Sequence, residues 1–190
     1  MINDYPELIA EVSARSGVSD VASRARMHVG MAEKMLSRRL RLSGMETAVT
    51  LTTDVEGSAN LPDDFQEMRT VCTNKRELIR QAVGAVLYGR ATGYFVHGKT
   101  LKSSYRSTPH DCLYYAAIPG LEKNNTNWLL AYEPEIYLQA VMLQVYVSQF
   151  DVDKVQATSS YLDGLIETAQ QADHMKRHSG TRINLGRVAL

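Results

Sequence analysis

The chain has 190 residues, which is enough for one domain that buries roughly 70% of the surface exposed by the unfolded chain. Its 21 Lys and Arg residues are balanced by 21 Asp and Glu residues, so the formal net charge is zero. A dedicated nucleic-acid-binding protein usually carries a basic excess, which this composition lacks. A net charge near zero also favours self-association, because it removes the repulsion between copies.

The N-terminal sequence shows neither the basic leader nor the apolar core of a signal peptide. No apolar run reaches the roughly 18 residues that a membrane span requires. Cys72 and Cys112 are distant from each other in the sequence and lack the spacing of metal ligands, so we expect two reduced thiols. These features predict a protein made in the cytoplasm, without contact with a membrane.

Two helices are predicted in the first 44 residues. In the first helix, Asp4 is the expected N-cap, Pro6 lies in the first turn and Gly17 marks the C-terminal end. The second helix is expected over residues 19–42. Arg39 falls beside the apolar stripe of that helix, where a charge needs a partner. Its stem could pack while its head reaches water, or it could form an ion pair across a subunit boundary.

The hydrophobic period changes to strict alternation at residues 45–53, which predicts a strand rich in β-branched residues. Further strands are predicted at residues 68–73, 94–96, 100–105 and 111–118. Residues 81–88 are predicted to form a short helix with Ala82, Val83, Val86 and Leu87 pointing inward. The middle of the chain is therefore expected to be a β-rich insertion.

The longest apolar run of the sequence lies within residues 121–149. Trp128 packs a short capped turn, and Pro134 suits the first turn of the helix that follows. Ile136 and Leu143 share one face of this helix, which is apolar nearly all round and is therefore expected to be buried. We predict that Trp128, Ile136 and Leu143 anchor the core. A last long helix follows and ends in cations that favour a helix C terminus.

Together these elements predict a mainly α fold, a helical bundle with a small inserted β subdomain. The bundle would comprise residues 1–44 and 121–178, and the β-rich insertion residues 45–120. Residues 181–190 show no periodicity and cannot bury themselves against the bundle. We therefore expect a partner to hold the C-terminal tail, residues 179–190.

No catalytic constellation is recognisable in the sequence. It contains neither a Gly-rich phosphate loop nor a G-x-S-x-G elbow. Asp63 and Asp64 are better explained as turn formers than as a metal or acid–base site. His174 and His178 have i, i+4 spacing, but the neighbouring cations oppose a bound metal ion. We predict a structural protein with no catalytic residue, no metal and no cofactor.

Several strings of the sequence, in the same order, resemble the head-to-tail adaptor (connector) proteins of tailed bacteriophages and related gene-transfer particles. The strings are RRLRLSGME at residues 38–46, LPDDFQEMR at 61–69, YYAAIPGL at 114–121, TNWLL at 126–130 and PEIYL at 134–138. Each string alone is weak evidence, but together they span most of the chain at suitable spacing.

The resemblance implies a structural virion protein at the head–tail interface, made in the cytoplasm of the infected host. It implies a ring, a dodecamer, that binds beneath the portal protein and extends the DNA channel. The ring would provide the platform for a stopper or tail-completion protein, and DNA would pass through it without sequence-specific contact. In that family the C-terminal segment docks on the portal. The matching residues here are Thr181, Arg182, Ile183, Asn184, Leu185, Gly186, Arg187, Val188, Ala189 and Leu190.

A ring requires heterologous interfaces, in which one face of a subunit meets a different face of its neighbour. The basic cluster Arg38, Arg39 and Arg41 could pair with acids on a neighbouring subunit or on the portal, or could be a solvated helix end. The same cluster supports an alternative function, a nucleic-acid-binding helical module. Zero net charge and the lack of interleaved aromatic and basic residues weigh against this alternative.

Overall fold

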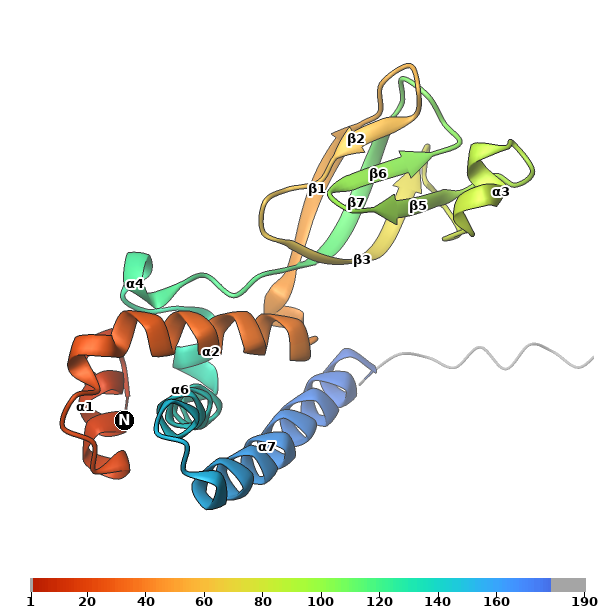
Figure 1. Ribbon diagram of the computed structural model, residues 1–190. Helices are drawn as coiled ribbons and strands as arrows, with labels where there is room; N and C mark the ends of the chain where they lie inside the picture. The colour runs from red at the N-terminus through yellow and green to blue at the C-terminus, as the bar shows by residue number, and fades with distance from the viewer. Residues whose placement is uncertain (1, 179–190) are drawn as a thin grey trace, which may run out of the picture.

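A computed structural model describes residues 2–178 of the chain, so the predicted C-terminal tail lies outside the described residues (Figure 1). All the helices except α3 gather in a helical region, and the strands form a separate β region together with α3. The helical region contains α1 (Tyr5–Ser16), η1 (Ala22–Arg24), α2 (Ala25–Arg39), η2 (Ser43–Met45), α4 (Leu121–Asn124), α5 (Trp128–Tyr132), α6 (Pro134–Ser148) and α7 (Val152–His178). The β region contains β1 (Glu46–Thr52), β2 (Ser58–Asn60), β3 (Phe65–Thr73), β4 (Arg76–Glu77), α3 (Val83–Leu87), β5 (Tyr94–His97), β6 (Thr100–Ser103) and β7 (Pro109–Ala116).

The boundaries of α1 follow the local sequence signals. The Asp4 carboxylate accepts a hydrogen bond from the backbone N–H of Glu7 at 2.9 Å, and Gly17 ends the helix in the left-handed conformation. By contrast, α2 ends at Arg39 and not at residue 42. Beyond it the backbone is extended, which lets Leu40 and Leu42 both enter the core.

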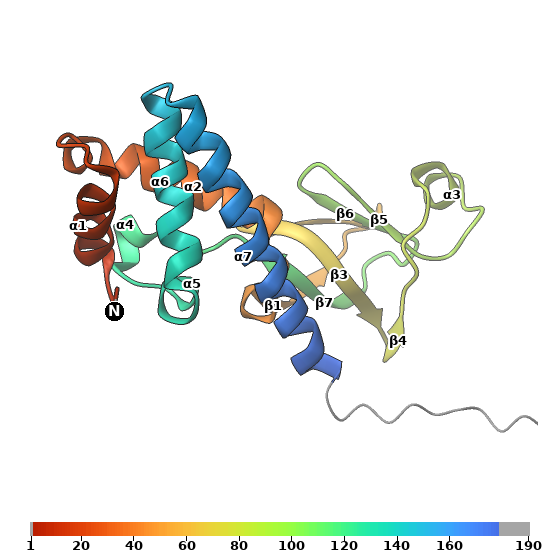
Figure 2. The same ribbon diagram turned by 90° about the horizontal axis from the view of Figure 1, so that it is seen from below.

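The central helix of the helical region is α6, which packs against α1, α2 and α7. Figure 2 shows α6 beside the long helix α7 and in front of α2. Ile136 and Leu143 are buried in this core, and Trp128 packs against it while half-buried. Because α6 meets other helices on several sides, its sequence is apolar around most of its circumference.

The β region consists of two antiparallel sheets, with the strand orders β1-β7-β3-β4 and β2-β6-β5. The long pairing of β1 with β7 joins the first and last strands, from Glu46 opposite Tyr115 to Thr52 opposite Pro109. These sheets enclose a hydrophobic core separate from that of the helices, which includes Leu61, Met68, Val71, Tyr94, Leu101, Cys112 and Tyr114.

The prediction of a helical bundle with a small β insertion is wrong. The protein is 50% helical and 22% strand, a mixed α/β fold with seven strands in residues 2–178. The alternating segments are recognisable singly, but strands gain stability only by pairing. Since β1 pairs with β7 across a long stretch of sequence, the local pattern cannot reveal that the strands build a second core.

The inward orientation predicted for the short helix is also wrong. Val83 and Leu87 are 45% and 58% exposed, and no residue of α3 is buried. The helix lies at the outer end of the β region, beyond both sheets (Figure 1). The helix follows the short strand β4 at the edge of its sheet and makes few contacts except with β5, so no element covers its apolar side chains.

Two buried histidines couple folding to pH. His28 is 2% exposed, and burial together with the nearby Arg24 lowers the pKa of its imidazole below the ordinary 6.5. His110 is fully buried, and burial lowers its pKa too, although the Tyr105 carbonyl and Asp111 act in the opposite direction. The folded protein therefore favours neutral imidazoles.

We predict that the free energy of unfolding falls as the pH drops below about 6.5, because there the unfolded chain binds protons that the folded chain does not. The stabilisation is present above that pH and is lost toward the lowered pKa values of the folded state. Urea unfolding at about pH 7.5 and about pH 5.5 measures the difference. His28→Leu should reduce it, whereas the control His97→Leu, at an exposed position, should not. An unchanged pH dependence in His28→Leu would contradict the assignment.

Candidate assembly surface

Residues 2–178 contain no group of three or more His, Cys, Asp or Glu side chains that could hold a metal ion. Burial raises the pKa of the Cys112 thiol to about 11, which keeps it protonated at neutral pH. Burial and a hydrogen bond to Asp64 at 3.0 Å raise the pKa of Tyr114 to about 12.

Among the helices of the described residues, none combines the length and hydropathy of a membrane span.

The helical and β regions meet at a polar junction centred on Arg177, in the last turn of α7. Its Nε donates to Asp173 at 2.6 Å, its Nη1 pairs with Glu46 at the start of β1, and the same Nη1 donates to the Tyr115 hydroxyl at 3.2 Å. Glu46 also pairs with Arg69 of β3. The Glu46 carboxylate therefore lies between two guanidinium groups and fixes the end of α7 against the base of the β region.

Asp173 extends the junction to η2. It accepts a hydrogen bond from the backbone N–H of Ser43 at 3.1 Å. Burial would raise the pKa of Asp173, but the bonds from Ser43 and Arg177 outweigh it and lower the pKa. Beside it, the ring of Trp128 lies so close to Gly44 that a Cβ there would meet the ring at 2.7 Å. A groove of about 320 Å³ between α5 and α7 adjoins these residues.

Two of the three arginines predicted at a subunit interface make ion pairs within the chain. Arg39 pairs with Asp163 of α7, and the Nε of Arg41 lies 2.6 Å from Glu67. Arg38 is exposed and forms no ion pair within residues 2–178. The structure thus separates the cluster, with Arg41 near the junction and Arg38 facing solvent. An interface role for these arginines stays a prediction.

A second polar cluster, which the sequence did not lead us to expect, holds the chain where it returns from the β region. The Tyr137 hydroxyl donates to Glu33 at 2.6 Å, and Glu33 also accepts from the backbone N–H of Leu121 at 2.7 Å. Asn127 donates to the Tyr137 hydroxyl at 3.2 Å. Burial, with Glu33 beside it, raises the pKa of Tyr137. A tyrosine hydroxyl in a buried helix needs a hydrogen-bond partner. The position of Tyr137 in a helix predicted to be buried is therefore the feature of the sequence that indicates such a cluster.

Helix α3 lies at the outer end of the β region (Figure 1). Large apolar side chains on and beside this helix are exposed. We call this surface the α3 face; it comprises Ile79, Val83, Leu87 and Tyr88, with the basic residues Arg80 and Arg90. Ile79 is 70% and Tyr88 75% exposed. Within residues 2–178 neither Arg80 nor Arg90 makes an ion pair, although the Arg90 guanidinium lies over the Tyr88 ring, 5.7 Å from its centre.

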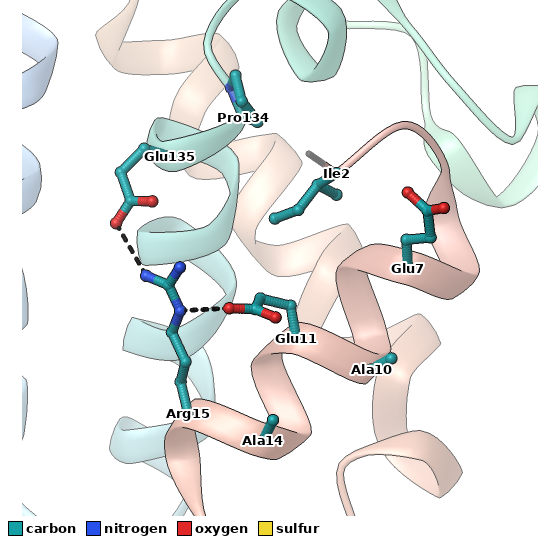
Figure 3. A pocket seen from close by; sticks show the side chains of 8 residues that line it. All are labelled: Ile2, Glu7, Ala10, Glu11, Ala14, Arg15, Pro134 and Glu135. Carbon is teal, nitrogen blue, oxygen red and sulfur yellow. Dashed lines mark hydrogen bonds and ion pairs between the residues drawn. The ribbon is translucent and has the colours of Figure 1, made fainter.

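At the opposite end, a groove of about 600 Å³ lies between α1 and the start of α6 (Figure 3). We call it the α1–α6 groove; it is lined by Ile2, Glu7, Ala10, Glu11, Ala14, Arg15, Pro134 and Glu135. Arg15 pairs with Glu11 at 2.6 Å and with Glu135 at 3.3 Å, as Figure 3 shows. Three carboxylates against a single guanidinium leave the groove acidic.

The fold and these surfaces define a mixed α/β protein with a polar junction between its two regions and with two exposed faces of opposite character. The chain belongs to the SU10 adaptor protein family, whose model matches residues 3–184. The match confirms the resemblance to phage head-to-tail adaptors. It makes the chain a structural protein of a phage virion that assembles with other capsid or tail proteins. A comparison with curated proteins finds no match.

We predict that Glu46→Gln lowers the free energy of unfolding by about 2 kcal/mol, because it removes the charge between two guanidinium groups: Arg69 loses its carboxylate partner and Arg177 keeps only Asp173. The Glu46 and Arg177 side chains are only 17% and 18% exposed. Urea unfolding measures the change. As a control, Glu122→Gln removes the exposed pair with Arg26 and should cost less than about 0.5 kcal/mol. Equal losses in the two variants would contradict a structural role for the junction.

Proposed function

We propose that this chain is the subunit of a ring, a dodecamer, that binds beneath the portal protein of its virion. The ring extends the DNA channel and is the platform for a stopper or tail-completion protein. DNA passes through it without sequence-specific contact, and the chain is not an enzyme. Membership of the adaptor family over residues 3–184 is the observation that carries this proposal. Exposed faces of opposite character on one chain suit the heterologous contacts of a ring.

The residues beyond α7 are proposed to bind the portal. The Arg177 junction fixes the last turn of α7 against the β region, so the point at which residues 179–190 follow the described residues is held relative to both regions. The sequence of residues 181–190 combines two arginines with apolar side chains, which suits a groove on another protein.

We predict that deletion of residues 181–190 leaves a folded chain that no longer assembles on the portal, because the deletion removes the docking segment and no described residue. Native mass spectrometry of the purified chain, alone and mixed with the portal of its virion, measures assembly. A variant in which a Gly/Ser segment of equal length replaces these residues serves as the control for chain length. Assembly of the deleted chain at the wild-type level would refute the docking role.

The alternative function, a nucleic-acid-binding helical module, has less support. Two arginines of the cluster on which it rests, Arg39 and Arg41, have carboxylate partners within the chain. Such pairs reduce the charge available to phosphate groups. Retention on immobilised DNA that falls steeply with added salt, without any assembly on the portal, would favour this alternative.

A further inference from the structure

The α3 face has the properties of a surface that binds another molecule. Four large apolar side chains gather on and beside a helix that buries none of its own residues. The four lie within residues 79–88, and large apolar side chains exposed together on one short segment are typical of an interaction site. Tyr and Arg are also the residue types enriched at the centres of protein interfaces. Arg80 and Arg90 add positive charge that no ion pair within the described residues neutralises.

The chemistry of the α3 face favours a protein partner over DNA. Ile79, Val83 and Leu87 offer aliphatic surface, which neither phosphate groups nor base edges require. A nucleic-acid site would place more aromatic rings between the basic residues, whereas Tyr88 is the one aromatic side chain of this face. The partner should therefore combine an apolar floor with carboxylates at its rim.

The α1–α6 groove has these properties. Ala10 and Ala14 line the groove with small, exposed side chains that let another backbone approach closely, and Ile2 and Pro134 add apolar surface (Figure 3). Glu7 lies beside Ile2 at one end of the groove, and the ion pairs that Arg15 makes with Glu11 and Glu135 lie toward the other end. The acidic rim is complementary to the basic rim of the α3 face.

The two surfaces also have the arrangement that a ring needs. Helices α3 and α1 lie at opposite ends of the molecule in both views (Figures 1 and 2), so the α3 face and the α1–α6 groove are far apart. They therefore cannot meet within one chain. A contact between opposite ends of identical subunits is heterologous, repeats from copy to copy, and closes into a ring when the rotation between copies allows it.

We propose that the α3 face of one subunit inserts into the α1–α6 groove of a second copy of this chain, with Arg80 and Arg90 facing the acidic rim. This proposal rests on the proposed ring and identifies the two surfaces that join neighbouring subunits. It is separate from the portal contact of residues 181–190.

The test is a charge reversal on each surface and then on both. Arg80→Glu with Arg90→Glu reverses the α3 face, and Glu7→Lys with Glu11→Lys reverses the groove. Each should raise the concentration needed for ring assembly on the portal by about tenfold or more, because like charges then meet. A chain that carries all four substitutions should recover assembly. Lys99→Glu with Arg106→Glu is the matched control, since it changes the net charge of the β region equally.

Native mass spectrometry with the portal reads out ring assembly, and thermal unfolding shows that each variant is folded. Recovery in the fourfold variant supports the contact, because a variant that merely misfolds is not rescued by further substitutions. Wild-type assembly in the α3 reversal, or no recovery in the fourfold variant, overturns the contact while leaving the ring intact. Absence of rings in the wild type refutes the proposed function itself. Loss of DNA retention by the α3 reversal, with rings unchanged, would assign the face to nucleic acid.

Discussion

The carboxylate of Glu46 holds the helical and β regions of the molecule together by charge. It faces Arg69 on β3 and Arg177 on α7, and Arg177 in turn reaches Asp173 and Tyr115. The helical and β cores are separate, although Tyr115 of β7 packs against the helical core beside this network. A largely buried ion network is sensitive to geometry, because a displaced partner leaves an uncompensated charge. The junction therefore makes the end of α7 and the base of the β region one rigid element.

This rigidity matters for an assembly protein. In a subunit that contacts neighbours at opposite ends, an error in the angle between the ends accumulates around a ring. The Glu46 network acts on one side of the connection, and the Glu33–Tyr137 cluster acts on the other, where the chain returns from β7 to α4. The two crossings between the helical and β regions are thus each tied to a helix by polar side chains.

The local signals of the sequence are sufficient for most elements and insufficient for their assembly. Asp4 and Gly17 act through neighbours within a turn, so they mark both ends of α1. Glu46 and Arg177 are separated by 131 residues, and no local pattern indicates that they meet. The basic residues near the end of α7 suit the helix dipole, yet Arg177 also binds side chains of β1 and β7. Long-range pairing likewise joins the short strands into two sheets with a core of their own, which the separate strand segments do not indicate.

The prediction for α3 fails for a related reason that bears on function. A run of apolar residues with helical spacing predicts that one face is covered, but the pattern is the same whether the cover comes from the same chain or from another copy. The prediction places Val83 and Leu87 in a core because it looks for the covering residues within the same chain. The structure leaves both side chains exposed. In a protein that works within a virion, a core-like helix without a cover in its own chain is what a subunit interface looks like before assembly. If the α3 face makes the proposed contact, the apolar pattern of α3 correctly predicts burial. That burial then occurs in the assembled ring and not in the single subunit.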